Sequence, residues 1–436
     1  MKRILLTMGL ATSLTASLFA GETLNLKLVP DQSCLLKGSS HEVVVKIDLS
    51  AIAGRKKFKR APLNLAVVLD KSGSMTGAKL EKAKQAAMLL VDRLTPKDIF
   101  SLVIYSDKAR VLVPAQHVED KDVLKARIES IQASGSTALY SGVQTGADQI
   151  REYFSSKRIN RVILLSDGLA NVGPSTPHAL RQFGCQLAER GISVTTIGVG
   201  DDYNEDLMAG LAEASDANYY YVKDTEKLPK IFAKELGELL TVAARDVRIE
   251  IVCPHGVKPL GFIGRAEKFE NQKATVNLSQ FTTGQDRYLM LRCLVNEDQP
   301  ELAHVKVNYM DDLDGGTDQT VEGVARIHFT DDEKLADKSV NYAVTAEKEL
   351  MLTAVAKDEA MSQADAGNYR QAAATLTAQG GALSTAYENA PAAVQMKIRS
   401  ELDNLNNFTN QLEQGEYGSG LRKTMQWQSF DTRNSK

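Results

Sequence analysis

The sequence predicts an α/β protein: a doubly wound, mostly parallel sheet (Rossmann-like) inserted in a β-sandwich, with a C-terminal α-helical region. Three observations support this fold class. Residues 61–242 alternate continuous apolar runs with amphipathic helical patterns, which is typical of a parallel sheet covered on both faces. Residues 21–60 and 243–330 alternate apolar and polar positions in short segments, which predicts strands. Residues 331–436 have Ala-rich helical spacing without strand signals.

The central segment, 61–242, contains five apolar stretches, one edge strand and six helical patterns. The predicted strands are Leu63–Leu69, Ile99–Tyr105, Arg161–Ser166, Ile192–Val199 and the short Tyr219–Val222, with Arg110–Val113 as an edge strand. The predicted helices are Lys79–Leu94, Asp122–Gln132, Leu139–Tyr153, Pro177–Arg190, Asn204–Ala214 and Glu226–Leu240. The alternation of the two classes along the chain is what favours a parallel sheet.

The flanking segments need a common partner, because a short isolated strand ribbon is not stable. Strands are predicted at Thr23–Val29, His41–Leu49, Val247–Cys253, Ala274–Leu278, Tyr288–Val295, Ala303–Tyr309 and Val321–Phe329. We therefore expect 21–60 and 243–330 to form one β-sandwich around the inserted sheet. Three helices follow, at Lys338–Ala366, Tyr369–Ala386 and Ala392–Glu413, and the last twenty or so residues are expected to fray.

The N-terminus and the charge balance restrict the class of protein. Residues 1–20 combine Lys2 and Arg3 with an uncharged apolar run, which predicts a secretory signal peptide cleaved after Ala20; an uncleaved anchor is the alternative. After this segment the sequence contains no run of about 18 or more apolar residues, so no further membrane span is predicted. The 52 basic and 55 acidic residues nearly balance, which argues against nucleic acid as a partner. The sequence thus predicts export to a periplasm or to the cell surface.

Two charged segments and the cysteines leave alternatives open. The basic Gly54–Arg60 is interpreted as a hinge at a boundary, with an anionic-surface patch as the alternative, and Asp311–Gln319 as a hairpin turn rather than a calcium loop. Export permits disulfides. Cys185 falls on a predicted helix, and a bridge between two of Cys34, Cys253 and Cys293 is plausible, but the sequence does not choose the pair.

A candidate metal site is assembled from three separated segments. Asp70, Ser72 and Ser74 follow the strand Leu63–Leu69 directly. Thr137 precedes a helix, and Asp167 follows the strand that ends at Ser166. Both aspartates stand at carboxyl ends of predicted parallel strands, where open α/β sheets place their ligands. Helix capping by the two serines is the alternative interpretation, but it does not require Thr137 or Asp167.

The residue types suit Mg²⁺, with Ca²⁺ or Mn²⁺ as alternatives. Mg²⁺ is a hard cation that prefers octahedral oxygen ligands and keeps several waters. Three hydroxyls and two carboxylates leave such an ion electrophilic. An open coordination position would then attract a carboxylate from a protein partner.

This combination resembles the von Willebrand A domain family, whose metal-ion-dependent adhesion site has the pattern D-x-S-x-S with a distant Thr and Asp. All five positions match. The resemblance implies that Ser72, Ser74 and Thr137 contact the metal, and that Asp70 and Asp167 act mainly through water. It extends over residues 61–225 and includes Gly77–Ala87, Leu164–Gly173, Thr195–Met208 and Asn218–Val222. The chain is similar here to exported bacterial A-domain proteins and to inter-alpha-trypsin-inhibitor heavy chains.

The predicted function is divalent-cation-dependent protein binding, in adhesion or in complex assembly. A structural envelope scaffold with a stabilising metal is the first alternative. A metal-dependent hydrolase is the second, and the sequence argues against it: H-E-x-x-H, G-x-S-x-G and P-loop motifs are all absent. We therefore expect no catalytic residues.

Overall fold

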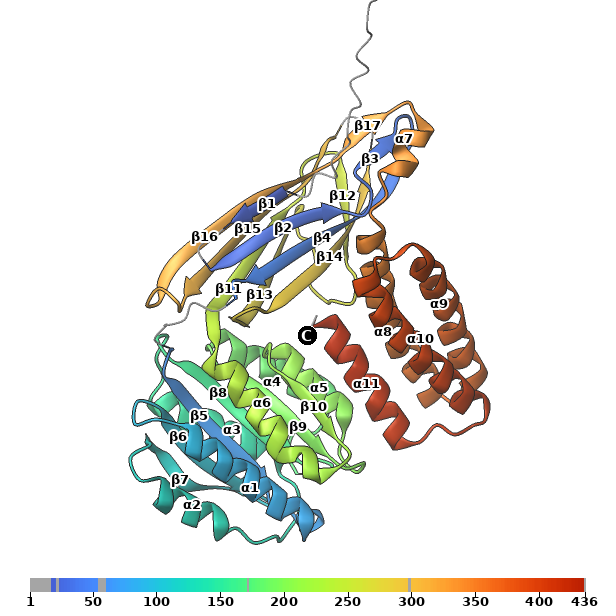
Figure 1. Cartoon of the computed structure of the whole chain (residues 1–436). Helices are drawn as coiled ribbons and strands as arrows, with labels where there is room; N and C mark the ends of the chain where they lie inside the picture. Colours follow the sequence, from blue (N-terminus) through green and yellow to red (C-terminus); the bar gives the residue numbers. More distant parts are fainter. Residues whose placement is uncertain (1–16, 21–22, 54–59, 171, 297–298, 435–436) are drawn as a thin grey trace, which may run out of the picture.

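The structure, a computed structural model, describes residues 17–20, 23–53, 60–170, 172–296 and 299–434. These residues form a six-stranded sheet with helices on both faces, a β-sandwich, and a C-terminal group of helices (Figure 1). The fold class predicted from the sequence is confirmed. The bounds of the separate units at residues 60, 242 and 330 stay a prediction.

The six-stranded sheet has the order β10-β9-β8-β5-β6-β7, in which β7 alone is antiparallel to its neighbour. Its strands are β5 (Leu63–Asp70), β6 (Ile99–Tyr105), β7 (Ala109–His117), β8 (Ile159–Ser166), β9 (Ser193–Val199) and β10 (Tyr219–Val222). Every position of β5, β6, β8 and β9 is buried. Burial on both faces explains why these strands are continuous apolar runs in the sequence.

Helices cover this sheet on two faces and enclose two separate hydrophobic cores. One face packs against α1 (Ala78–Arg93), α2 (Lys121–Glu129) and α6 (Leu228–Leu240). The other packs against α3 (Leu139–Glu152), α4 (Pro177–Glu189) and α5 (Glu205–Ala214). This two-sided cover makes the carboxyl edge of the sheet the open place for a ligand.

The β-sandwich combines strands from both sides of the inserted sheet. One layer has the order β1-β2-β4-β14-β12 and the other β13-β11-β15-β16. The strands are β1 (Ser17–Ala20), β2 (Leu24–Pro30), β4 (His41–Ala51), β11 (Val242–Val252), β12 (Val257–Phe262), β13 (Lys273–Thr282), β14 (Asp286–Val295), β15 (Glu301–Asp311) and β16 (Thr317–Arg326). Strand β4, which precedes the parallel sheet in the chain, pairs with the whole of β14, which follows it, so the parallel sheet is inserted within the sandwich.

The N-terminal segment is described only in part. Residues 1–16 of the predicted signal peptide, and 54–59 of the basic segment, lie outside the described residues. Ser17–Ala20 pairs with β2 at the edge of the sandwich. Cleavage after Ala20 would remove β1 and leave β2 as the edge strand. Across the described residues, no helix is long and apolar enough to cross a membrane.

Some elements differ from the sequence expectation. Strand β12 was not predicted, because Pro259 and Gly261 interrupt its pattern and its pairing with β14 shifts register between them. The predicted helix from Lys338 is instead α7 (Glu333–Lys338) followed by α8 (Tyr342–Asp365). The Asn341 side chain starts α8 by accepting hydrogen bonds from two backbone amides. A parallel pair of β3 (Cys34–Leu36) and β17 (His328–Thr330) was also missed.

The expectation that the last twenty residues fray is wrong. Residues Ser419–Arg433 form α11, which packs on α8 and against α5 and β10 of the inserted domain (Figure 1). With α9 (Tyr369–Asn389) and α10 (Ala392–Glu413), α8 and α11 enclose a core of their own. Phe430 is 2% exposed and stacks edge-on against Tyr219. Tertiary packing, rather than local propensity, therefore stabilises this helix.

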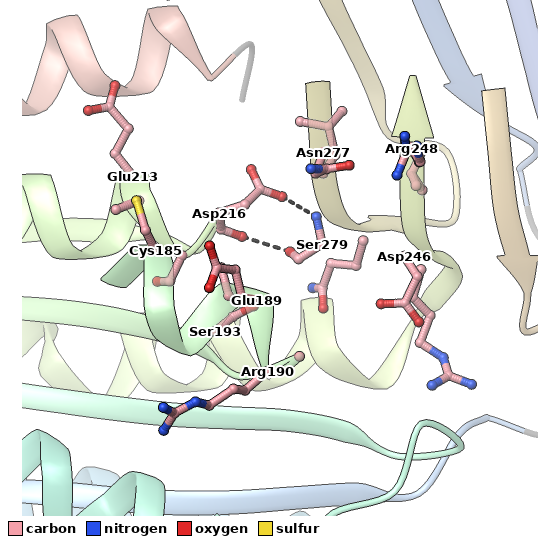
Figure 2. A pocket seen from close by; sticks show the side chains of 18 of the residues that line it. Cys185, Glu189, Arg190, Ser193, Glu213, Asp216, Asp246, Arg248, Asn277 and Ser279 are labelled. Atoms are coloured by element: carbon pink, nitrogen blue, oxygen red, sulfur yellow. Dashed lines mark hydrogen bonds between the residues drawn. The ribbon is translucent and has the colours of Figure 1, made fainter. Parts of the chain in front are cut away.

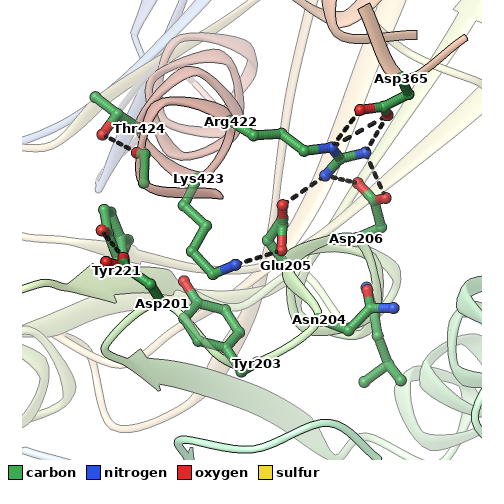
Figure 3. Close-up of polar contacts among 12 residues, drawn as sticks. Asp201, Tyr203, Asn204, Glu205, Asp206, Tyr221, Asp365, Arg422, Lys423 and Thr424 are labelled. Atoms are coloured by element: carbon green, nitrogen blue, oxygen red, sulfur yellow. Dashed lines mark hydrogen bonds and ion pairs between the residues drawn. The ribbon is translucent and has the colours of Figure 1, made fainter. Parts of the chain in front are cut away.

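A polar cluster also fastens α11 to the inserted domain (Figure 3). The Arg422 guanidinium lies 2.7 Å from Glu205, 2.8 Å from Asp206 and 2.7 Å from Asp365. The neighbouring Lys423 lies 2.8 Å from the other Glu205 oxygen. These carboxylates raise the pKa of Arg422 against the opposing effect of burial. One arginine thus ties α11 both to α5 and to α8.

Replacing Arg422 with Met is expected to lower the free energy of unfolding by about 2 kcal/mol, because three carboxylates lose their common partner. Two of the three carboxylates, those of Asp206 and Asp365, are partly exposed. The loss of stability is therefore expected to be smaller than for a fully buried ion pair. Differential scanning calorimetry measures the change, and limited proteolysis at the start of α11 detects its release. Arg326→Met is the control: its ion pair with Glu301 is exposed and is expected to contribute less than about 1 kcal/mol. Equal losses in the two variants would refute the anchoring role.

Candidate metal site

The two aspartates of the candidate site are placed by neighbouring strands. Strands β5 and β8 are paired in parallel. Asp70 is the last residue of β5, and Asp167 is the first residue after β8. Their carboxyl groups therefore lie at the same edge of the sheet, as predicted from the sequence. Both side chains are completely buried.

The third segment is tied to the first by backbone hydrogen bonds. The Gly73 N–H donates to the Gly135 carbonyl at 3.0 Å, and the Ser134 N–H donates to the Lys71 carbonyl at 2.6 Å. These bonds hold the loop before α3 beside the loop after β5. Thr137, which is 4% exposed, is thereby carried to the same place. The structure thus brings together all five residues that the sequence singled out.

Hydrogen bonds orient the side chains of the site. Asp70 accepts from the Ser72 backbone N–H at 2.8 Å and from the Ser166 hydroxyl at 2.9 Å. The Ser74 hydroxyl donates to one Asp167 oxygen at 2.8 Å and lies 3.1 Å from the Ser72 hydroxyl. Ser74 is exposed, whereas Ser72 is 2% exposed. The two carboxylates are thus buried, and the site is open to solvent on the side of Ser74.

Gly168 keeps space free among these oxygens. A Cβ atom at this position would lie 2.9 Å from the Thr137 hydroxyl oxygen and 3.7 Å from that of Ser74. Any larger residue would therefore press into the group of hydroxyls. In the described part of the chain, no three His, Cys, Asp or Glu side chains gather as a metal cluster. Here two carboxylates are completed by hydroxyls, an all-oxygen set that fits a hard divalent cation.

The electrostatics of Asp70 also favour a cation. Burial raises the pKa of Asp70, hydrogen bonds from Ser72 and Ser166 oppose that rise, and the charge of Asp167 adds to it. Two buried carboxylates close together destabilise each other's charged form. A cation between them would relieve both the desolvation and the repulsion.

Two contributors were missed from the sequence. The sequence indicates Ser166 only as the end of the strand before Asp167, but its hydroxyl donates a hydrogen bond to Asp70. Lys79, in the first turn of α1, places its ammonium 2.6 Å from the Asp167 oxygen that Ser74 leaves free. Its position, five residues after Ser74 and second in the following helix, places it near the site, but the sequence does not set the direction of its side chain. The site thus contains a positive charge of its own.

The acidic loop Gly200–Asn204 follows β9 at the same carboxyl edge of the sheet. Its Asn204 side chain caps α5 by accepting from the Leu207 N–H at 3.0 Å. Asp201 accepts from the Tyr221 hydroxyl at 2.5 Å (Figure 3). A Cβ atom on Gly200 would lie 3.4 Å from the Lys79 ammonium, so this loop borders the candidate site. Its polar groups are largely committed to structure.

A cavity of about 1000 Å³ lies at the opposite, amino-terminal edge of the sheet, against the sandwich (Figure 2). Its walls carry many charged groups that bond across the interface. Ser279 donates to the Asp216 carbonyl at 2.7 Å, and Arg287, which lies outside the cavity lining, is 2.8 Å from the Asp216 carboxylate. Arg161 donates to Gln280 at 2.9 Å. We interpret this cavity as the polar junction between the two units, separate from the candidate metal site.

Part of this chain is similar in sequence to known proteins. Residues 64–234 match the family model of the von Willebrand factor type A domain. Uncharacterized protein YfbK of Escherichia coli is 30% identical over 215 residues, which cover 49% of this chain and 37% of that protein. Human inter-alpha-trypsin inhibitor heavy chain H4 is 30% identical over 160 residues, 35% of this chain and 17% of that protein. The chain thus spans well under half the length of both relatives.

Among solved structures, the von Willebrand factor type A protein from Catenulispora acidiphila superposes with a TM-score of 0.66 at 18% identity. The match covers 90% of this chain and 91% of that one. At this identity the likeness concerns the fold alone. It shows that the fold of most of the chain, beyond the inserted sheet, has a counterpart in a solved structure.

Proposed function

We propose that this von Willebrand factor type A domain protein is exported and binds another protein through a divalent cation. The domain supports metal-dependent protein interaction in general terms. The candidate ligands are Asp70, Ser72, Ser74, Thr137 and Asp167. The observation that carries the proposal is their convergence, from three separated segments, around the space that Gly168 leaves open.

Mg²⁺ is the proposed cation, with Ca²⁺ and Mn²⁺ as the alternatives. When bound, it would supply a Lewis-acidic centre that accepts an oxygen ligand from outside the chain. The chain's own residues hold the site: Ser72, Ser74 and Thr137 offer hydroxyl oxygens, and the two buried aspartates offer charge. Ser166 and the Ser72 backbone fix Asp70 in place.

The charge balance supports an acidic partner. Two aspartates offset a divalent cation, and Lys79 adds one positive charge 2.6 Å from Asp167. The loaded site would therefore carry a net positive charge beside solvent. A carboxylate from a partner protein fits both this charge and the open side at Ser74. We propose no enzymatic activity, because the site has hydroxyls and carboxylates but no separate general base.

The test begins with the metal alone. Isothermal titration with MgCl₂ is expected to show binding in the full chain and at least about a tenfold loss of affinity in Thr137→Ala, since one oxygen ligand is removed. Thr145→Ala, in helix α3, which begins two residues after Thr137, is the matched control and should bind Mg²⁺ normally. Unchanged affinity in Thr137→Ala would refute the assignment of the site.

The partner is tested by capture from an envelope extract in Mg²⁺ and elution with EDTA. A protein that elutes with EDTA, and is not captured by Thr137→Ala, supports the binding function. A large loss of thermal stability in EDTA with capture unchanged would instead favour the scaffold alternative, in which the metal only stabilises the fold.

A further inference from the structure

Two of the four cysteines face each other across the core of the β-sandwich. Cys253 directly follows β11, whose inward positions Val247, Ile249 and Ile251 are all buried, and it continues their alternation. Cys293 is an inward position of β14, which belongs to the other layer. Their side chains are 2% and 0% exposed and belong to the same hydrophobic core.

The connection after Cys253 brings the two residues to the same end of the sandwich. The chain turns at Pro254–Gly256 into β12, where Val257 pairs with Val295 and Pro259 pairs with Cys293. The two side chains also influence each other: Cys293 lowers the pKa of Cys253, and Cys253 raises the pKa of Cys293. The remaining two cysteines are elsewhere: Cys34 lies on β3, and Cys185 is exposed on α4.

We propose that Cys253 and Cys293 form a disulfide that links the two layers of the β-sandwich when the chain folds in an oxidising compartment. The proposed disulfide selects one pair among Cys34, Cys253 and Cys293, a choice that the sequence leaves open. It is independent of the metal site, and it accords with export because exported proteins retain disulfides.

The chemistry is thiol–disulfide exchange with a small-molecule or protein disulfide as the oxidant. Exchange begins when one of the two thiols, for example that of Cys253, loses its proton and becomes the nucleophilic thiolate. It attacks one sulfur of the oxidant, forms a mixed disulfide and releases one thiolate. Cys293 then loses its proton and attacks the Cys253 sulfur, which releases the second thiolate. Two protein thiols become one cystine, and the oxidant is reduced to two thiols. Because both sulfurs are buried in the folded chain, an oxidant can reach them only before folding is complete, so the exchange takes place during folding.

The test is refolding of the full chain in a buffer of reduced and oxidised glutathione, followed by alkylation in denaturant. We expect two of the four thiols to be alkylated, and a non-reduced digest to contain the Cys253 peptide linked to the Cys293 peptide. Adding a reductant is expected to lower the melting temperature by roughly 10 °C. Four alkylated thiols, or a linkage that involves Cys34 or Cys185, would overturn the proposal.

Variants separate the pair from the other cysteines. Cys34→Ser and Cys185→Ser should keep the linked peptides and the reductant-sensitive melting temperature. Cys253→Ser and Cys293→Ser should each lose both, and reductant should no longer affect their melting. If either of these two does not fold, the thiol count and digest of the unmodified chain still decide the question.

Discussion

Replacing Lys79 with Met is expected to raise the affinity of the candidate site for Mg²⁺ by about tenfold or more. The Lys79 ammonium lies 2.6 Å from an oxygen of the completely buried Asp167. It therefore competes with a divalent cation for the negative charge of this carboxylate. Removing it leaves two buried aspartates without a cation of the chain's own. At an effective dielectric constant of about 20, one charge a few ångströms away alters binding by several kcal/mol before relaxation.

The same substitution should destabilise the metal-free protein. A buried carboxylate that loses its partner costs on the order of 3 kcal/mol, because the remaining charge is uncompensated. Saturating Mg²⁺ should restore much of that loss, since ligand binding to the native state adds stability by mass action. The metal-induced rise in melting temperature should therefore be larger in Lys79→Met than in the parent chain.

Two further variants make the test specific. Lys79→Arg keeps the charge and should bind Mg²⁺ much as the parent chain does. Lys82→Met, on the same helix, removes an ion pair with the exposed Glu226 and should leave the affinity unchanged. Titration calorimetry in EDTA-treated buffer measures all four proteins. A Mg²⁺ affinity in Lys79→Met equal to or below that of the parent would show that the ammonium does not compete with the cation.

Substituting Gly198 with Ala is expected to lower the free energy of unfolding by about 3 kcal/mol or more. Gly198 lies in β9 under the ring of Tyr203, and an added Cβ atom would overlap that ring. Tyr203 is 2% exposed, and its hydroxyl is 2.8 Å from the hydroxyl of Tyr219. The ring cannot move away without breaking this bond and disturbing the adjoining core.

A second glycine gives the matched control. Gly237 lies inside α6, and an added Cβ atom there would meet no heavy atom within 4 Å. Gly237→Ala is therefore expected to stabilise the protein by about 0.5–1 kcal/mol, because alanine loses less backbone entropy in a helix. Urea unfolding followed by circular dichroism compares the two variants. A Gly198→Ala protein as stable as the parent would contradict the packing argument.

Local periodicity carried most of the fold prediction. The continuous apolar runs of β5, β6, β8 and β9 are buried on both faces of the sheet, and the alternating segments on either side became the two layers of the sandwich. The pattern was weakest where it was interrupted. Strand β12 was missed because Pro259 and Gly261 interrupt its pattern, and α11 was missed because its sequence is largely polar.

The candidate metal site followed from strand-end positions. Asp70 and Asp167 each come directly after an apolar run, and parallel strands end at one edge, so their convergence could be anticipated from the sequence. Lys79 could not, because its role depends on which way a long side chain on α1 turns. The hydrogen bonds that bring Thr137 beside them also connect segments far apart in the sequence.

By itself, the sequence determined the alternation of elements, the five candidate ligands and the number of cysteines, since each depends on residue type and local spacing. Only the tertiary structure decided which thiols face each other, where α11 docks, and that an ammonium stands beside Asp167. Each of these depends on contacts between residues distant in the chain. Such contacts are fixed by how whole layers pack, and local sequence patterns do not specify that packing.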